Sequence, residues 1–153
     1  MAGRTRRPVV QPTAFWDTSA LVPLCAQQIN TANALAAYKR YPAAVVWWAT
    51  PVEIESALAR LVRVNQISPT DWAKARKLAS ALADDWSVIR PSEVIRTKAM
   101  RLIERYDLRA ADALQLAAAL EWCEDTPQGR LFLTADEKLL QAAMLSGFNA
   151  RRV

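Results

Sequence analysis

The chain has 153 residues, of which 52% are hydrophobic and 23% are charged, a balance typical of one ordinary globular domain. No apolar stretch reaches the roughly 20 residues that a membrane span needs. The absence of histidine excludes Ser-His and Cys-His catalysis, and the net charge of +5 is compatible with a polyanionic partner without requiring one.

Residues 1–12 are predicted to form a flexible basic arm that carries Arg4, Arg6 and Arg7. No apolar segment follows these arginines, so the arm is not a secretory signal; it is either a frayed tail or an arm that contacts nucleic acid. The two cysteines, Cys25 and Cys123, lie among apolar neighbours with no CxxC pairing. We therefore predict no disulfide and a reducing, cytoplasmic environment.

Strands and helices are predicted to alternate along the chain. The predicted strands are 9–16, 43–49, 86–90, 131–133 and an edge strand at 148–153. The predicted helices are 18–24, 29–41, 51–65, 69–84, 93–105, 109–122 and 136–145. The first is expected to stop near Pro23, and Gly147 is suited to end the last. This alternation predicts an α/β fold, a three-layer α/β/α sandwich with a mostly parallel central sheet, formed by one domain at 13–153.

Acidic residues follow three of the predicted strands. Asp17 and Asp136 come directly after the first and fourth strands, and Glu53 lies just beyond the second. Open parallel sheets bind ligands at the carboxyl ends of their strands, so these acids are expected to meet at one edge. A fourth acid, Asp112, enters a nearly all-apolar helix face, where a carboxylate is costly unless it is paired or bound to metal.

Helix capping offers an alternative role for two of these acids. Asp17 is well placed to cap the short helix that follows it. Thr50, Pro51 and Glu53 have the spacing of a capping box with proline at the first helical position. A carboxylate at a helix N-terminus can also face a site, so the two roles are compatible.

The fourth strand presents the same ambiguity. Thr134 can cap the following helix with Glu137 at its third position, whereas Asp136 lies nearer the strand end and is the preferred site residue. Two other acids are predicted to be structural. Asp71 has the capping spacing but follows no strand, and Glu55 should face away from the site.

A cluster of carboxylates needs a cation. Two carboxylates about 4 Å apart repel by about 4 kcal/mol at an effective dielectric constant near 20. Without imidazole or paired thiolate ligands, the fitting ion is a hard one, Mg²⁺ or Mn²⁺, which activates a bound water and polarises a phosphoryl oxygen. The hydroxyl groups of Thr18, Ser19 and Thr134 can either orient the carboxylates or cap helices.

Four short motifs, each weak alone, carry a further signal. They are Asp17-Thr18-Ser19-Ala20-Leu21, Glu53-Ile54-Glu55-Ser56-Ala57-Leu58, Asp112-Ala113-Leu114-Gln115-Leu116-Ala117 and Leu133-Thr134-Ala135-Asp136. Their order, spacing and strand context resemble those of the PIN-domain nucleases, especially the VapC-like toxins of bacterial and archaeal toxin–antitoxin pairs. The resemblance covers residues 14–153.

The resemblance implies which residues form the site. The acidic quartet of the family, which is both catalytic and metal-binding, maps onto Asp17, Glu53, Asp112 and Asp136, with Ser19 and Thr134 in supporting positions. The chain departs from the family at Gln115, where histidine is frequent, and at Trp16, where a smaller aliphatic residue is commoner. Neither departure removes an acid.

The resemblance also implies an activity and partners. It implies a Mg²⁺- or Mn²⁺-dependent endoribonuclease that cuts RNA, forms a homodimer and is inhibited by a cognate antitoxin protein. Leu21, Val22 and Leu24 can support such contacts, but by composition they are better suited to the core. Two alternatives stay open: a catalytically inactive PIN-like module that binds RNA or protein, and a Mg²⁺ phosphotransferase on a similar sheet.

Overall fold

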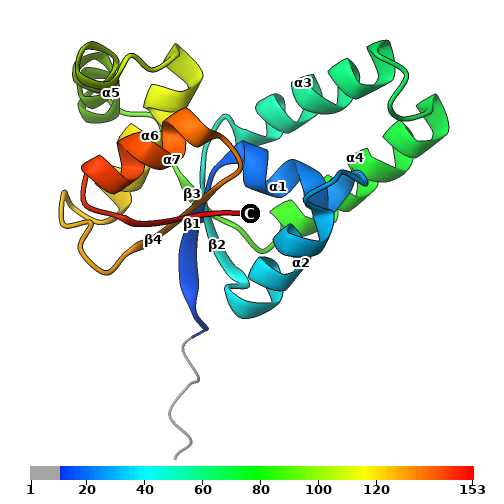
Figure 1. Ribbon diagram of the computed structural model, residues 1–153, viewed down its shortest axis with the longest axis horizontal. Helices are drawn as coiled ribbons and strands as arrows, with labels where there is room; N and C mark the ends of the chain where they lie inside the picture. The colour runs from blue at the N-terminus through cyan, green and yellow to red at the C-terminus, as the bar shows by residue number, and fades with distance from the viewer. Residues whose placement is uncertain (1–10) are drawn as a thin grey trace, which may run out of the picture.

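Five strands form one sheet in the computed structural model, which describes residues 11–153 (Figure 1). The strands are β1 (Thr13–Trp16), β2 (Ala43–Trp47), β3 (Ser87–Ile89), β4 (Leu131–Thr134) and β5 (Asn149–Arg152). Their order is β3-β2-β1-β4-β5, and every neighbouring pair is parallel. The parallel sheet and the edge strand predicted from the sequence are thus confirmed.

Seven helices connect and cover the strands. They are α1 (Thr18–Cys25), α2 (Thr31–Arg40), α3 (Thr50–Arg63), α4 (Pro69–Ala83), α5 (Glu93–Tyr106), α6 (Ala110–Trp122) and α7 (Glu137–Leu145). Helix α1 continues past Pro23 to Cys25, one residue beyond the predicted end at 24. Gly147, with φ of 105°, follows α7 at the position predicted for it.

Two apolar cores, one on each face of the sheet, make the fold a three-layer sandwich. In the central strand β1, Ala14 and Trp16 face the core formed with helices α1 to α4. Phe15 points to the other face and joins the core formed with α5, α6 and α7. Figure 1 shows the same division, with α1 to α4 on one side of the sheet and α5 to α7 on the other. This alternation follows from the two-residue period of a strand.

The strand order reverses at β1, which creates a crevice at its carboxyl end. The chain passes from β1 to β2 and β3 on one side, and it later adds β4 and β5 on the other. The register pairs Phe15 with Phe132 and Trp16 with Leu133. The backbone N–H of Asp17 continues this ladder by donating to the carbonyl of Leu133 at 2.9 Å. Ligand sites of parallel sheets form at such a reversal.

Some sequence-based boundaries need correction. The first strand begins at Thr13, because residues 11 and 12 are not in a strand and the rest of the predicted start, 9 and 10, lies outside the described residues, as does most of the basic arm. The second strand ends at Trp47, and a turn follows at 48 and 49. None of the helices described between residues 11 and 153 is long and apolar enough to cross a membrane.

Buried residues settle two further expectations. Cys25 and Cys123 are free and buried, as predicted. Leu21, Val22 and Leu24 belong to the core between the sheet and α1 to α4, so the core role that composition favoured is confirmed. A contact surface for partners has to be sought elsewhere.

Candidate active site

A hollow of about 570 Å³ lies at the crevice, and all four predicted acids line it. Asp17 follows β1, Asp136 follows β4, Glu53 lies in the first turn of α3 and Asp112 in the first turn of α6. Residues from four segments of the chain thus meet in one place. We call this hollow the acidic pocket; its other lining residues are Thr18, Ser19, Val22, Gln28, Asn30, Ser56, Ala57, Arg60, Arg63, Arg109, Ala111 and Ala135.

Asp17 is almost fully buried and is held through one of its two carboxylate oxygens. Its Oδ2 accepts the backbone N–H of Ser19 at 3.2 Å, the Ser19 hydroxyl, and the Thr134 hydroxyl at 2.9 Å. The first of these bonds caps α1, so Asp17 has the capping role as well. Because all three donors meet Oδ2, the other oxygen, Oδ1, has no side chain assigned to it in this network.

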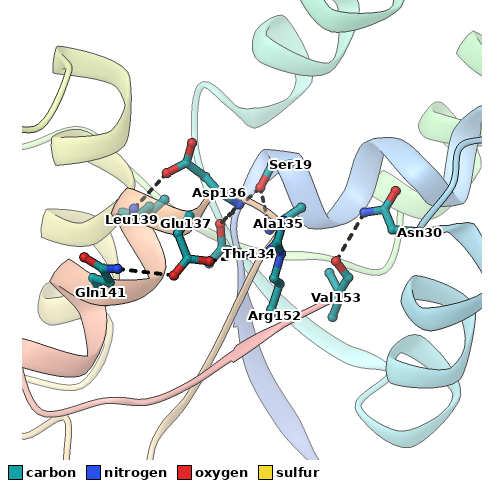
Figure 2. A network of polar contacts seen from close by, with 10 residues as sticks. All are labelled: Ser19, Asn30, Thr134, Ala135, Asp136, Glu137, Leu139, Gln141, Arg152 and Val153. Carbon is teal, nitrogen blue, oxygen red and sulfur yellow. Dashed lines mark hydrogen bonds and ion pairs between the residues drawn. The ribbon is translucent and has the colours of Figure 1, made fainter.

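Thr134 links Asp17 to Asp136. While its hydroxyl donates to Asp17, the same oxygen accepts the backbone N–H of Asp136 at 3.0 Å. Figure 2 shows Ser19 of α1 beside Thr134 and Ala135, where its Oγ accepts the Ala135 N–H at 2.8 Å. These two hydroxyls therefore tie the ends of β1 and β4 together, and they orient a carboxylate rather than cap a helix.

Asp136 is itself the cap of α7. Its Oδ1 accepts the backbone N–H of Leu139 at 2.8 Å, as Figure 2 shows. The alternative in which Thr134 caps with Glu137 is wrong, because the helix begins at Glu137, one residue later than predicted. The second oxygen of Asp136 carries no hydrogen bond among the side-chain bonds of the described residues, and the residue lines the acidic pocket.

The capping box predicted for Glu53 does not form. Helix α3 begins at Thr50 itself and is preceded by Ala49, with no side-chain cap. Thr50 is fully buried, and Glu53 turns instead toward the neighbouring helices. Its Oε2 accepts the hydroxyl of Thr18 at 2.9 Å and Nε2 of Gln115 at 3.1 Å. Tertiary contacts, not local capping, fix this carboxylate.

The buried position of Asp17 changes its acidity. Burial raises the pKa of Asp17 to about 6, and the charge of Glu53 adds to the rise. The hydrogen bonds from Ser19 and Thr134 favour the carboxylate but only partly offset burial. Ionisation of Asp17 in the metal-free fold is therefore costly, mainly because the carboxylate is buried, and a nearby cation would reduce that cost.

Asp112 responds to the same surroundings. Burial is the main cause of its raised pKa, and the charges of Asp136 and Glu53 raise it further, while Arg109 acts in the opposite direction. The negative charges of two other acids in the pocket therefore act on Asp112. The four acids form one electrostatically coupled group, because Glu53 also acts on Asp17.

The donor set of the pocket fits a hard divalent cation. It offers carboxylate oxygens and hydroxyls, the ligands that Mg²⁺ and Mn²⁺ prefer. As the side chains stand, no three His, Cys, Asp or Glu residues within 11–153 are close enough together to hold one ion. The fit consequently rests on the shared pocket and on the two raised pKa values, not on a formed coordination sphere.

The two acids predicted to be structural lie elsewhere. The Ser68 hydroxyl accepts the Asp71 N–H at 3.0 Å and donates to its Oδ2 at 2.8 Å, which confirms the cap. Glu55 pairs with Arg76 at 3.1 Å, outside the acidic pocket. Asp71 and Glu55 are thus outside the acidic pocket, whereas the four predicted site acids line it.

The sequence assigned no role to Arg60 and Arg63, which line the acidic pocket, or to Gln115, which lies outside the lining but contacts Glu53. Gln115 is fully buried and contacts Glu53, and its signal was a lone amide three residues after Asp112 on an Ala- and Leu-rich helix. Arg60 and Arg63 line the pocket from the last turns of α3. Their spacing of seven and ten residues from Glu53 places them on the same helix face.

A comparison with protein families decides the relationship of the chain to known proteins. The profile of the PIN domain matches residues 14–145, which include all four acids of the pocket. The chain belongs to the PIN domain family. The two curated relatives that follow are both ribonucleases: Ribonuclease VapC45 and Ribonuclease VapC49 of Mycobacterium tuberculosis. Each is 30% identical over 112 residues, which cover 71% of this chain and 76% of the relative.

Solved structures show the same PIN fold. The protein PAE2754 from Pyrobaculum aerophilum matches with a TM-score of 0.64 at 22% identity, over 93% of this chain and 90% of that one. A toxin–antitoxin complex from Klebsiella pneumoniae gives 0.59 at 19% identity, over 81% and 87%. FitAcB from Neisseria gonorrhoeae gives 0.60 at 16% identity, over 90% and 97%. At these identities the likeness concerns the fold.

Proposed function

We propose that this PIN domain is a metal-dependent endoribonuclease and acts as the toxin of a toxin–antitoxin pair. The observation that carries the proposal is the meeting of Asp17, Glu53, Asp112 and Asp136 in one pocket. The ribonuclease names of the curated relatives supply the reaction class. Asp17, Glu53, Asp112 and Asp136 are the residues that we assign to metal binding and catalysis, with Ser19 and Thr134 in support.

The chemistry that a bound Mg²⁺ or Mn²⁺ supplies is an activated water for attack on phosphorus and charge neutralisation at the phosphoryl oxygens. The chain's own residues hold the carboxylates of the site in fixed positions. Ser19 and Thr134 hold Oδ2 of Asp17, which leaves its other oxygen to the pocket. Thr18 holds Oε2 of Glu53. Such fixed carboxylates lower the reorganisation that the reaction requires.

Arginines also line the pocket, and their positive charge suits the binding of RNA phosphates. Glu53, Ser56, Ala57, Arg60 and Arg63 line the pocket along a single face of α3. At 1.5 Å per residue, Arg60 lies about 10 Å and Arg63 about 15 Å along the helix from Glu53. Acids at one end bind a cation, whereas arginines at the other bind phosphates. A polyanionic chain laid along α3 meets both.

The same proposal includes partners and a location. The solved toxin–antitoxin complex with this fold supports an antitoxin protein as partner, which would cover the acidic pocket. Homodimerisation and a cytoplasmic location stay predictions; the free buried Cys25 and Cys123 suit a reducing compartment. Size-exclusion chromatography with light scattering tests the dimer.

Cleavage of RNA by purified protein tests the activity. Incubation of total RNA with the wild-type chain and Mg²⁺ or Mn²⁺ is expected to yield discrete fragments, and EDTA is expected to abolish them. Asp112→Asn should also abolish them while leaving the circular dichroism spectrum unchanged. Sequencing of the fragment ends then gives the cut sites. An antitoxin candidate is expected to restore growth when it is co-expressed with an inhibitory chain.

Two results would contradict the proposal. Binding of RNA without cleavage at any divalent ion tested would favour a non-catalytic module. Hydrolysis of small phosphate esters in place of RNA would favour a phosphotransferase. EDTA-resistant cleavage that Asp112→Asn does not reduce would indicate a contaminating nuclease.

A further inference from the structure

Gln115 is a buried amide that reaches into the acidic pocket's acid network from α6. Its side chain is fully inaccessible to solvent, and its neighbours on α6 from 116 to 119 are leucine and alanine. Burial of an amide costs free energy unless hydrogen bonds replace those made to water. The bonds that Gln115 makes are therefore informative about its role.

The amide nitrogen of Gln115 serves the two helices that carry Glu53 and Thr18. Its Nε2 donates to Oγ1 of Thr18 at 2.9 Å and to Oε2 of Glu53 at 3.1 Å, with a longer contact to Thr50 at 3.5 Å. The Thr18 hydroxyl in turn donates to the same Oε2 at 2.9 Å. Two donors thus converge on a single oxygen of Glu53.

The amide oxygen of Gln115 takes no part in this network. Oε1 of Gln115 is buried and has no hydrogen-bond partner among the described residues. An unpaired buried carbonyl is a net cost to stability of the fold. A residue kept only to strengthen the core would be better replaced by an isosteric apolar side chain. The donor end, not the whole amide, is what the site uses.

From these contacts we propose that Gln115 is a positioning residue for Glu53. It clamps Oε2 together with Thr18 and leaves Oε1 of Glu53 as the oxygen presented to a cation in the pocket. The role rests on the proposed metal-dependent function. Partners that hold metal-binding carboxylates in place commonly change metal affinity or activity 10- to 100-fold when removed.

Metal binding by three variants tests the proposal. Gln115→Met removes the donor and the unpaired oxygen at similar volume, Gln115→His restores an N–H donor, and Thr50→Val removes only the 3.5 Å contact. Mn²⁺ affinity is measured by electron paramagnetic resonance titration, with kcat and KM for an RNA substrate and the unfolding temperature in EDTA recorded beside it.

The expected result is about a tenfold weaker Mn²⁺ affinity and a lower kcat for Gln115→Met, with KM for RNA nearly unchanged. Gln115→His should recover most of both, and Thr50→Val should resemble the wild type. The unfolding temperature of Gln115→Met in EDTA should not fall, because its unpaired oxygen is gone. These outcomes together would support a positioning role.

A wild-type Mn²⁺ affinity and kcat in folded Gln115→Met would overturn the inference. If Gln115→Met does not fold, Thr18→Val carries the test, since it removes the second donor to the same Glu53 oxygen and must weaken Mn²⁺ binding. Unchanged binding in Thr18→Val would equally overturn it. A wild-type chain that neither binds Mn²⁺ nor cleaves RNA would overturn the proposed function and this inference with it.

Discussion

The hydroxyl of Thr134 lies 2.9 Å from Oδ2 of Asp17, across a sequence separation of 117 residues. Together with Ser19, it satisfies one oxygen of a nearly fully buried carboxylate, and the other oxygen has no side-chain donor within residues 11–153. The network therefore uses Asp17 only as an acceptor at a single atom. An amide oxygen can take that place, which makes a clean separation of fold and chemistry possible.

Replacement of Asp17 by asparagine should remove catalysis and keep the structure. The amide oxygen can accept the same three bonds, including the cap of α1, whereas the NH₂ group cannot bind a cation. We expect kcat/KM for RNA to fall by about 100-fold or more, since loss of a metal ligand costs several kcal/mol in the transition state. Asp71→Asn, at an exposed cap outside the pocket, is the matched control and should cleave RNA normally.

The stability of metal-free protein should depend on pH through Asp17. Its pKa is about 6 in the fold against 3.8 for the free side chain, so the folded state binds the proton more tightly. Stability from this group is then full below pH 4 and is lost as pH rises through 6, by about 3 kcal/mol at most. In urea unfolding with EDTA, the free energy of unfolding of Asp17→Asn should rise relative to that of the wild type between pH 4 and 6. Above pH 6 the difference between the two proteins should stay constant.

That measurement has a clear contrary outcome. If the free-energy difference between Asp17→Asn and the wild type stays constant from pH 4 to 7, Asp17 titrates normally and the burial argument fails. Metal binding has the opposite dependence, because the cation competes with the proton. Mn²⁺ affinity of the wild type should accordingly fall as pH decreases below about 6.

The arginines of α3 should act on substrate binding and not on the chemical step. We expect Arg60→Ala and Arg63→Ala each to raise KM for RNA about three- to tenfold and to reduce the slope of log KM against log salt concentration by roughly one. The kcat should stay within about twofold. Arg101→Ala, an exposed arginine on α5 outside the acidic pocket, serves as the control.

An equal loss for Arg101→Ala would mean that only total charge matters. A fall in kcat without a change in KM would place Arg60 or Arg63 at the reacting phosphate. Steady-state cleavage of a labelled RNA oligonucleotide at several salt concentrations distinguishes these outcomes.

Gly147 should be a site where stability changes without a loss of catalysis. Its φ is 105°, and a Cβ there would come within 3.0 Å of Cγ of Pro127. Gly147→Ala is expected to destabilise the fold by about 1–3 kcal/mol, or several degrees of unfolding temperature. At Gly129, φ is 77° and the space around an added Cβ is open, so Gly129→Ala measures the cost of backbone strain alone. It should lower the free energy of unfolding by about 1 kcal/mol.

Activity measured well below the unfolding temperature should be the same for both glycine variants and the wild type. A stable Gly147→Ala protein would show that the loop around Pro127 moves to admit the methyl group. Differential scanning calorimetry in EDTA provides the comparison.

The sequence predicted which acids meet, but it did not predict how they are held. Asp17 and Asp136 follow strands, and a parallel sheet brings the carboxyl ends of its strands together. The positions of these two acids in the sequence were therefore enough to predict that they meet. Glu53 matched a capping box locally, yet its partners are Thr18 and Gln115, which lie 35 and 62 residues away. Local spacing carries no information on such tertiary donors.

The same reason explains the errors at element boundaries. Thr50 begins α3 and does not cap it, and it is fully buried beside Gln115, a tertiary contact that a local pattern cannot show. Pro23 lies inside α1, and the helix nevertheless continues to Cys25. By contrast, the three-layer architecture was predicted correctly, since alternating strands and helices favour a parallel sheet covered by helices on both faces.

Helices α3 and α4 lie side by side and extend away from the sheet (Figure 1). Only the first turn of α3 takes part in the acid network, through Glu53, while Arg60 and Arg63 lie at its far end. Mutations that reshape this distal end leave the bonds around Asp17 and Thr134 untouched. Over evolution, target preference and cutting chemistry can therefore diverge at different rates within one domain.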